Sequence, residues 1–96
     1  MAAGYIIAYV DVTDPQQYEQ YKVLSSKAMQ AHGAEVLVRG GKAEPLEGEW
    51  APTRVVVLKF RSYADARAFY DSEEYLAARN SREHAATMNM IVVEGV

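Results

Sequence analysis

Hydrophobic and polar residues alternate at the start of the chain and predict a β-strand from Tyr5 to Val12. Successive side chains of a strand point to opposite faces of its sheet, so this strand would have two different faces. One face would carry aromatic and apolar groups with one carboxylate: Tyr5, Ile7, Tyr9 and Asp11. The other face would be aliphatic throughout: Ile6, Ala8, Val10 and Val12.

The next segment, from Asp14 to about His32, has the pattern of an amphipathic helix. The Asp14 carboxylate can accept hydrogen bonds from the free N–H groups of the first turn, and Pro15 suits the first helical position. Gly33 suits the left-handed residue that ends many helices. Apolar residues at spacings of three and four would form the buried stripe: Tyr18, Tyr21, Leu24, Ala28 and Ala31.

Three more strands and a second helical region follow. The strands are predicted over 34–39, 53–60 and 88–94. Gly40-Gly41 and the prolines within 42–52 indicate a loop between the second and third strands. Ser62 predicts a helix start and Ser72 predicts a restart, because a serine hydroxyl caps free N–H groups. The connection over 80–87 has no decisive pattern.

These elements predict one α+β domain over residues 1–96 with the ferredoxin-like order βαββαβ. Its four-stranded antiparallel sheet would have both helical regions on one face. The other face would expose Tyr5, Ile7 and Tyr9 to water, and a second sheet is the natural cover for such a patch. We therefore expect a homodimer in the form of a dimeric α/β barrel.

Composition and charge exclude several classes of partner and site. The net charge is −3 and the basic residues are scattered, so the chain offers no patch for a nucleic-acid backbone. No apolar stretch approaches the roughly 20 residues of a membrane span. The chain has no cysteine, which excludes disulfides, thiolate nucleophiles and zinc–sulfur sites. We expect a cytoplasmic protein that binds neither nucleic acid nor membrane.

An ordered set of short motifs extends over nearly the whole chain. The main ones are Val38-Arg39-Gly40-Gly41, Leu46-Glu47-Gly48, Arg54, and Tyr70-Asp71-Ser72 with Tyr75. Supporting ones are Gly4-Tyr5, Asp11, the region of Arg82, and Glu94-Gly95. Together they resemble the family known as domain of unknown function 1330.

This resemblance implies the dimeric α/β-barrel superfamily, in which two sheets pack face to face around a central space. Relatives there include cofactor-independent monooxygenases, muconolactone isomerases and haem-binding enzymes, so membership fixes no activity. The chain departs from the family pattern at Phe69, where tryptophan is common, and at Lys42, where proline is common. Haem binding is not expected, because His32 and His84 lie at a predicted helix end and in an undefined connection. No cofactor is predicted.

Three arginines are candidates for binding an anion. Arg39 precedes two glycines at a strand end, where its guanidinium can meet a carboxylate with paired hydrogen bonds. The alternative is a structural ion pair with Glu47 or another local acid. Arg54 and Arg82 have the same two interpretations, a clamp on an acidic ligand or a salt bridge between subunits.

Tyrosines supply the other candidate contacts with a small organic ligand. Tyr5, Tyr9, Tyr70 and Tyr75 offer apolar rings and hydroxyl donors, which suit a ligand site and a dimer interface equally. Asp11 is either a general acid or base in an apolar cavity or an acid at a turn. No metal site is predicted from the acidic loop residues.

Two functions remain open on this sequence. In the first, the dimer encloses a cavity that binds or transforms a small carboxylated or aromatic metabolite without a cofactor, as a monooxygenase or an isomerase would. In the second, the dimer is a non-catalytic structural or regulatory module and the same residues seal two sheets together. An open, arginine-lined cavity would favour the first, and a filled interior would favour the second.

Overall fold

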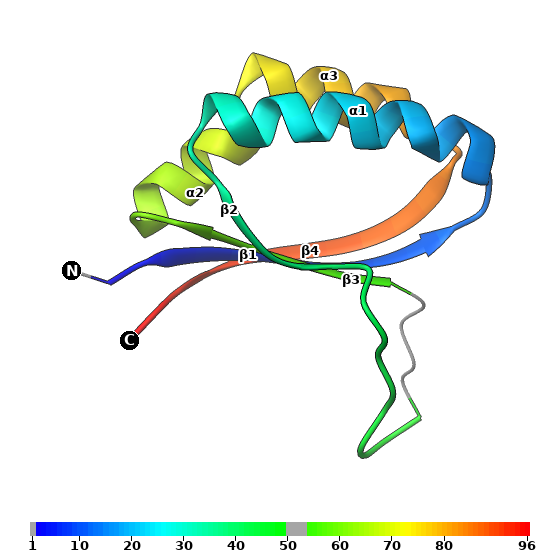
Figure 1. Ribbon diagram of the computed structural model, residues 1–96, viewed down its shortest axis with the longest axis horizontal. Helices are drawn as coiled ribbons and strands as arrows, with labels where there is room; N and C mark the ends of the chain where they lie inside the picture. The colour runs from blue at the N-terminus through cyan, green and yellow to red at the C-terminus, as the bar shows by residue number, and fades with distance from the viewer. Residues whose placement is uncertain (1, 50–53) are drawn as a thin grey trace.

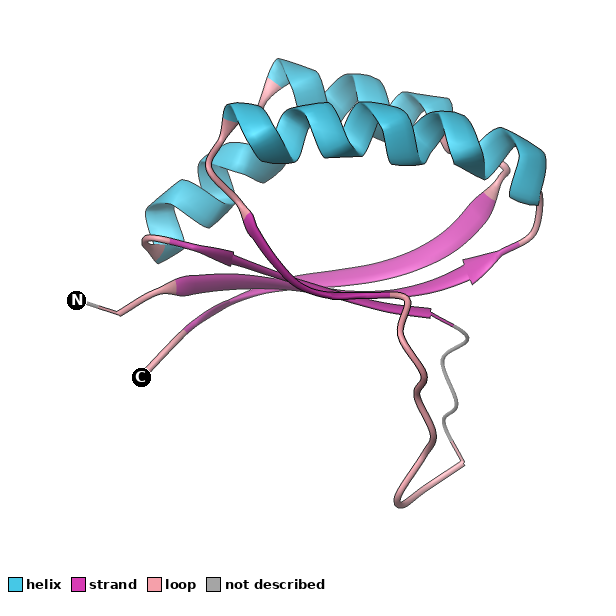
Figure 2. Cartoon of the chain, in the orientation of Figure 1, coloured by secondary structure: helices cyan, strands magenta, loops and turns pink. Residues whose placement is uncertain are grey.

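The computed structural model describes residues 2–49 and 54–96, which form seven elements of secondary structure (Figures 1 and 2). In chain order they are β1 (Gly4–Val12), α1 (Pro15–Ala31), β2 (Glu35–Arg39), β3 (Arg54–Phe60), α2 (Tyr63–Tyr70), α3 (Glu73–Ser81) and β4 (Ala86–Glu94). This is the predicted ferredoxin-like order, with the second helical region divided into α2 and α3. The predicted start of the third strand at Thr53 lies outside the described residues.

The four strands form one antiparallel sheet in the order β2-β3-β1-β4. Central strand β1 pairs along its length with β4 and with β3, and an irregularity between Val36 and Val38 shifts the register of β2 against β3. All three helices lie over the same face of the sheet (Figure 1). No helix in the described part of the chain is long and apolar enough to cross a membrane.

The two faces of β1 differ as its alternation predicts. Ile6, Ala8 and Val10 point toward the helices and are almost fully buried, with 1–3% of their surface exposed. They form the hydrophobic core with Leu58 and Phe60 of β3 and with apolar helix residues. No other element of the described residues forms a layer over the opposite face, and Ile91 of β4 is 52% exposed there. The sheet therefore keeps an uncovered apolar face in a single copy of the chain.

Local capping signals account for the helix boundaries. The Asp14 carboxylate accepts a hydrogen bond from the Gln17 N–H at 3.2 Å, and the Ser62 hydroxyl accepts one from the Asp65 N–H at 3.0 Å. The Ser72 hydroxyl does the same at the start of α3. Gly33, after α1, has a φ of +68°. The predicted caps and the left-handed glycine are confirmed.

Two details of the predicted helices and strands are wrong. Ala31 is exposed, and the buried stripe of α1 includes Ser25 and Met29 instead. At 100° per residue, Ser25 and Met29 lie in line with Tyr18, whereas Ala31 lies roughly 140° away around the axis. The undetermined connection is also shorter than expected, because α3 extends to Ser81 and β4 begins at Ala86.

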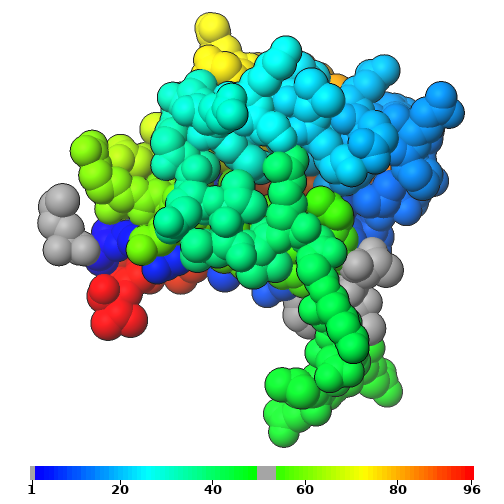
Figure 3. Space-filling model, in the orientation of Figure 1, coloured from blue at the N-terminus to red at the C-terminus, as the bar shows by residue number. Residues whose placement is uncertain are grey.

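The connection between β2 and β3 leaves the body of the domain as an arm. Residues 40–49 are all exposed, and Leu46 is 92% exposed. The arm extends past the uncovered face of the sheet, away from the helices (Figures 1 and 3). Its glutamates and Leu46 thus lie on the same side of the molecule as the uncovered face of the sheet.

Candidate functional site

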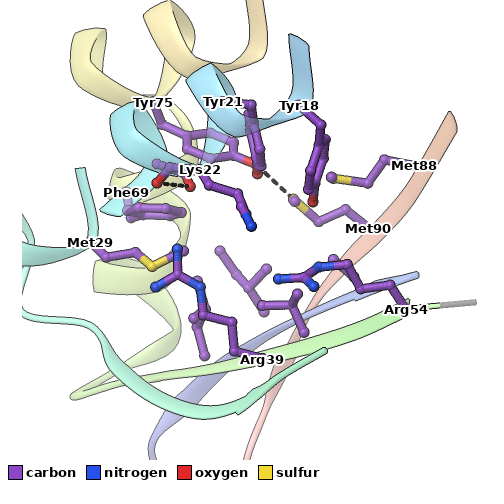
Figure 4. A pocket seen from close by; sticks show the side chains of 15 residues that line it. Tyr18, Tyr21, Lys22, Met29, Arg39, Arg54, Phe69, Tyr75, Met88 and Met90 are labelled. Carbon is purple, nitrogen blue, oxygen red and sulfur yellow. Dashed lines mark hydrogen bonds between the residues drawn. The ribbon is translucent and has the colours of Figure 1, made fainter. Parts of the chain in front are cut away.

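A cavity lies between the helices and the covered face of the sheet (Figure 4). Its helical wall consists of Tyr18, Tyr21, Lys22, Ser25, Met29, Phe69 and Tyr75. Its strand wall consists of Ile6, Ala8, Arg39, Arg54, Val56, Leu58, Met88 and Met90. The hollow measures about 420 Å³ including its open mouth, but water-sized molecules fit freely in only about 20 Å³ of it. A larger ligand therefore requires side chains to move.

Two tyrosine hydroxyls meet at the inner end of the cavity. The hydroxyl oxygens of Tyr21 and Tyr75 are 2.6 Å apart. Either hydroxyl can donate to the other, and when Tyr21 donates, the Tyr75 hydroxyl can donate to the Met90 Sδ atom at 3.9 Å. Burial raises the pKa of Tyr21, and the neighbouring Tyr75 raises it further. Burial also raises the pKa of Tyr75, so both hydroxyls are neutral donors at physiological pH.

Arg82 lies beside this hydroxyl pair. Its guanidinium carbon is 5.5 Å from the centre of the Tyr21 ring, within the range of a cation–π contact. Its Nε atom is buried and has no hydrogen-bond partner among the described residues. The positive charge and a hydrogen bond from Arg82 both act to lower the pKa of Tyr75, against the larger effect of burial. Arg82 thus strengthens Tyr75 as a donor.

Three cationic side chains converge on the mouth of the cavity. Arg39 and Arg54 extend from the sheet toward the tyrosines, and Lys22 extends from α1 between them (Figure 4). Arg39 Nη2 donates to the Ser26 hydroxyl at 2.7 Å, and Lys22 pairs with Glu19 at 2.9 Å on the outer side. These contacts hold two of the cations at the opening between α1 and β2, on the side of the molecule that Figure 3 shows.

Arg54 is more enclosed than Arg39, which is exposed. Its guanidinium carbon is 5.9 Å from the centre of the Tyr18 ring, and its Nε atom is buried without a partner among the described residues. Gly40 leaves room for the Arg54 guanidinium, because a β-carbon at residue 40 would overlap it. Gly40 also has a φ of +73°, a conformation that favours glycine. The double-glycine turn therefore shapes the mouth as well as turning the chain.

The cavity is cationic, and no anionic group lines it among the described residues. Among the described residues that line it, none is a carboxylate or an imidazole. No cluster of three or more histidine or acidic residues that could hold a metal ion occurs in the described part of the chain. An anion with an apolar body would complement this lining, because it would neutralise converging positive charges away from bulk water.

The structure brings several of the predicted site residues together. Arg39, Arg54 and Tyr75 line the cavity, and Arg82 lies against Tyr21 at its inner end. The Tyr70 ring stacks at 5.7 Å from that of Tyr75. Arg79 binds the Tyr70 hydroxyl at 3.1 Å and covers its ring, and Tyr70 lines a neighbouring pocket instead. Arg39 binds Ser26 and forms no ion pair with Glu47 among the described residues.

Three other predicted residues lie on the far side of the sheet. Tyr5, Tyr9 and Asp11 alternate with the buried residues of β1 and belong to its uncovered face. The sheet separates them from the cavity in the same protomer. The strand pattern predicts that this face is a dimer interface.

Sequence reasoning missed Tyr18, Tyr21 and Lys22 as site residues. The signal was present, because the buried stripe of α1 already contained both tyrosines. Lys22 follows Tyr21 at the edge of that stripe and therefore reaches the cavity mouth. The methionines of the cavity carried no signal of their own, since methionine is common in hydrophobic cores.

The family model described as "Domain of unknown function (DUF1330)" matches residues 3–96. No curated protein matches the chain. Among solved structures, a protein of unknown function from Rhodopseudomonas palustris superposes with a TM-score of 0.75 at 17% identity, covering 99% of this chain and 83% of that one.

Two further structures share the fold at low identity. One is a dimeric ferredoxin-like protein of unknown function from Thermobifida fusca, with a TM-score of 0.63 and 20% identity, covering 99% of this chain and 92% of that one. The other is SnoaB, a cofactor-independent oxygenase from Streptomyces nogalater, with a TM-score of 0.66 and 10% identity, covering 97% and 92%. These likenesses establish the ferredoxin-like fold and no activity.

Proposed function

Because the chain belongs to the domain of unknown function 1330 family, whose description assigns no activity, we propose a function from the site itself. The protein binds a small organic carboxylate with an apolar or aromatic body in the cavity between its helices and sheet. The carboxylate occupies the mouth between Arg39, Arg54 and Lys22. The body of the ligand extends toward Tyr18 and the methionines.

The convergence of three cations carries this proposal. Glu19 pairs with Lys22 on the outer side of the mouth, but no carboxylate of the described cavity lining pairs with Arg39 or Arg54. Like charges that share a small, partly enclosed space repel one another, and this repulsion costs free energy unless an anion is present. Arg54 Nε is buried and unpaired among the described residues, and Arg39 and Arg54 are both planar donors that suit a carboxylate. A purely structural role would call for an acidic partner inside the cavity, and its described lining has none.

Ligand binding requires the cavity to open. Its inner part is nearly filled, and side chains of Met29, Met88 and Met90 occupy its walls. Methionine has three rotatable bonds and adapts to irregular space, so these walls can rearrange around a guest at low cost. The bond from Arg39 to the Ser26 hydroxyl would be exchanged for a charge-assisted bond to the ligand.

The working form is a homodimer in this proposal. The uncovered face of the sheet is apolar, and the related protein from Thermobifida fusca is described as dimeric. A second chain packed on this face would cover Ile7, Tyr9 and Ile91 without blocking the cavity, which opens on the other side of the sheet.

As an enzyme, the protein would oxygenate or isomerise the bound ligand without a cofactor. The fold shared with SnoaB supports oxygenation only as an analogy. The second candidate is a non-catalytic dimeric module. The small free volume of about 20 Å³ favours it, since a filled interior suits a structural role.

A binding assay with matched charged and neutral ligands tests the proposal. Benzoate and phenylacetate should raise the melting temperature and shift backbone amide signals of cavity residues in NMR spectra, whereas benzamide and phenylacetamide should not. Arg54→Gln should weaken carboxylate binding by roughly tenfold, because a charge-assisted bond is lost. The matched control is Arg61→Gln, since Arg61 is exposed and pairs only with Asp65 among the described residues. Equal binding of acids and amides would contradict the proposal.

A further inference from the structure

The inner end of the cavity offers hydroxyl hydrogen-bond donors, whereas its mouth offers cationic donors. Tyr75 directs its hydroxyl hydrogen at the Met90 sulfur, 3.9 Å away. A thioether is a weak acceptor, so this donor is poorly satisfied in a place closed to bulk water. When Tyr21 donates to the Tyr75 oxygen, the Tyr75 hydrogen is left to Met90 and becomes more positive and a better donor. An oxygen atom of a ligand would readily replace the sulfur.

The same region has no group that could take a proton from a ligand. The described cavity lining contains no carboxylate and no imidazole. Burial keeps the two tyrosines protonated, and the Arg82 guanidinium adds a positive charge beside them. Every polar group at this end therefore donates hydrogen bonds or carries positive charge. Such an environment stabilises a negative oxygen more than a neutral hydroxyl, which would find only tyrosine and serine oxygens and thioether sulfurs to accept its hydrogen.

We propose that the inner end of the cavity selects ligands that carry an already ionised oxygen, such as the phenolate of an acidic phenol or the enolate of a 1,3-dicarbonyl compound. The anionic oxygen accepts from the Tyr75 hydroxyl in place of Met90, next to Arg82. This selection rests on the proposed function, in which the mouth holds a separate carboxylate. The protein does not remove the proton itself, so the ligand must be acidic enough to lose it to water.

A titratable dye tests this selection directly. The probe is para-nitrophenol, whose phenolate absorbs visible light and whose neutral form does not, and its non-ionisable control is para-nitroanisole. At a pH where half of the free probe is ionised, the bound probe should be almost entirely phenolate. The phenolate should bind about tenfold more tightly than the anisole, which is the ratio expected for one charge-assisted hydrogen bond. A bound probe that keeps the spectrum of the neutral phenol would overturn the inference.

Variants separate the inner site from the mouth. Tyr75→Phe should reduce phenolate affinity about tenfold and leave benzoate affinity nearly unchanged, because only the inner donor is removed. Tyr21→Phe keeps the Tyr75 donor and should reduce phenolate affinity by a smaller factor. This variant tests the inner site if Tyr75→Phe does not fold. If benzoate binds with dependence on Arg54 but both tyrosine variants bind the phenolate normally, the inner-site inference is wrong and the proposed function stands. If neither benzoate nor the phenolate binds, the proposed function fails and the inference fails with it.

Discussion

Replacing Gly40 by alanine separates the effect of the turn on folding from its effect on the site. Gly40 has a φ of +73°, so an alanine there costs roughly 1–2 kcal/mol of backbone strain. Its β-carbon would also overlap the Arg54 guanidinium. A guanidinium is the far end of a flexible side chain and can move aside, so the overlap should displace Arg54 rather than unfold the protein. We expect a moderate loss of stability together with loss of carboxylate binding.

Two other glycines provide matched controls. Gly33 has a similar φ of +68°, but nothing lies within 4 Å of where its β-carbon would be. Gly33→Ala should therefore cost the same roughly 1–2 kcal/mol and leave ligand affinity unchanged. Gly41 adjoins Gly40, has no positive φ, and also has open space around it. Gly41→Ala should change neither stability nor binding appreciably.

Thermal unfolding and benzoate titration measure the two effects independently. For a domain of this size, 1 kcal/mol corresponds to a shift of about 4–8 °C in melting temperature. Gly40→Ala and Gly33→Ala should shift it by similar amounts, and only Gly40→Ala should lose benzoate affinity. In a double-mutant cycle with Arg54→Gln, the second change should add little to the loss of affinity. Full benzoate affinity in Gly40→Ala would refute the reasoning, because Arg54 would then not depend on the absent β-carbon.

Three further predictions concern association, folding and pH. Light scattering should give twice the chain mass of 10.7 kDa. Ile7→Asp should shift the protein toward monomer, because it places a charge on the uncovered face of the sheet. A wild-type monomer at micromolar concentration would exclude this dimer. Asp14→Ala should lower the free energy of unfolding by about 1 kcal/mol, because α1 loses its N-terminal cap. Denaturant titration measures this loss, and an unchanged unfolding midpoint would mean that the cap is dispensable. The hydrogen bond with His32 lowers the pKa of Glu74 below its usual 4.5, so this pair stabilises the fold above that pH and loses its effect as the pH falls through the lowered value. Glu74→Gln should therefore flatten the acid side of a stability–pH profile, and an unaltered profile would show that the pair contributes nothing.

Local signals made the fold predictable. The caps at Asp14, Ser62 and Ser72 depend on a side chain and an N–H group three residues apart, so the sequence alone contains both partners. The alternation in β1 likewise separates its two faces without knowledge of any other element. The end of α3 and the start of β4 were harder, because no strong cap or breaker occurs between Ser81 and Ala86.

The site was only partly predictable because it depends on how α1 is oriented over the sheet. Arg39, Arg54 and Tyr75 were identified from their residue types and from family motifs, and the structure brings them to one cavity. Tyr21 and Lys22 reach the same cavity only because α1 turns that edge toward the sheet, which periodicity alone does not specify. The expected cavity lay between two sheets, whereas the cavity of the structure lies inside one protomer.

Because β1 packs side chains on both faces of the sheet, it restricts where the chain can gain or lose residues. Ile6 and Ala8 belong to the core beside the cavity, and Ile7 and Tyr9 belong to the uncovered face. Inserting or deleting a single residue in β1 would exchange the two sets, placing core residues outside and interface residues inside. The arm beyond Gly40, over residues 41–49, has no such constraint, because all of these residues are exposed. Length differences among relatives should therefore accumulate in the arm, and β1 should keep the same number of residues throughout.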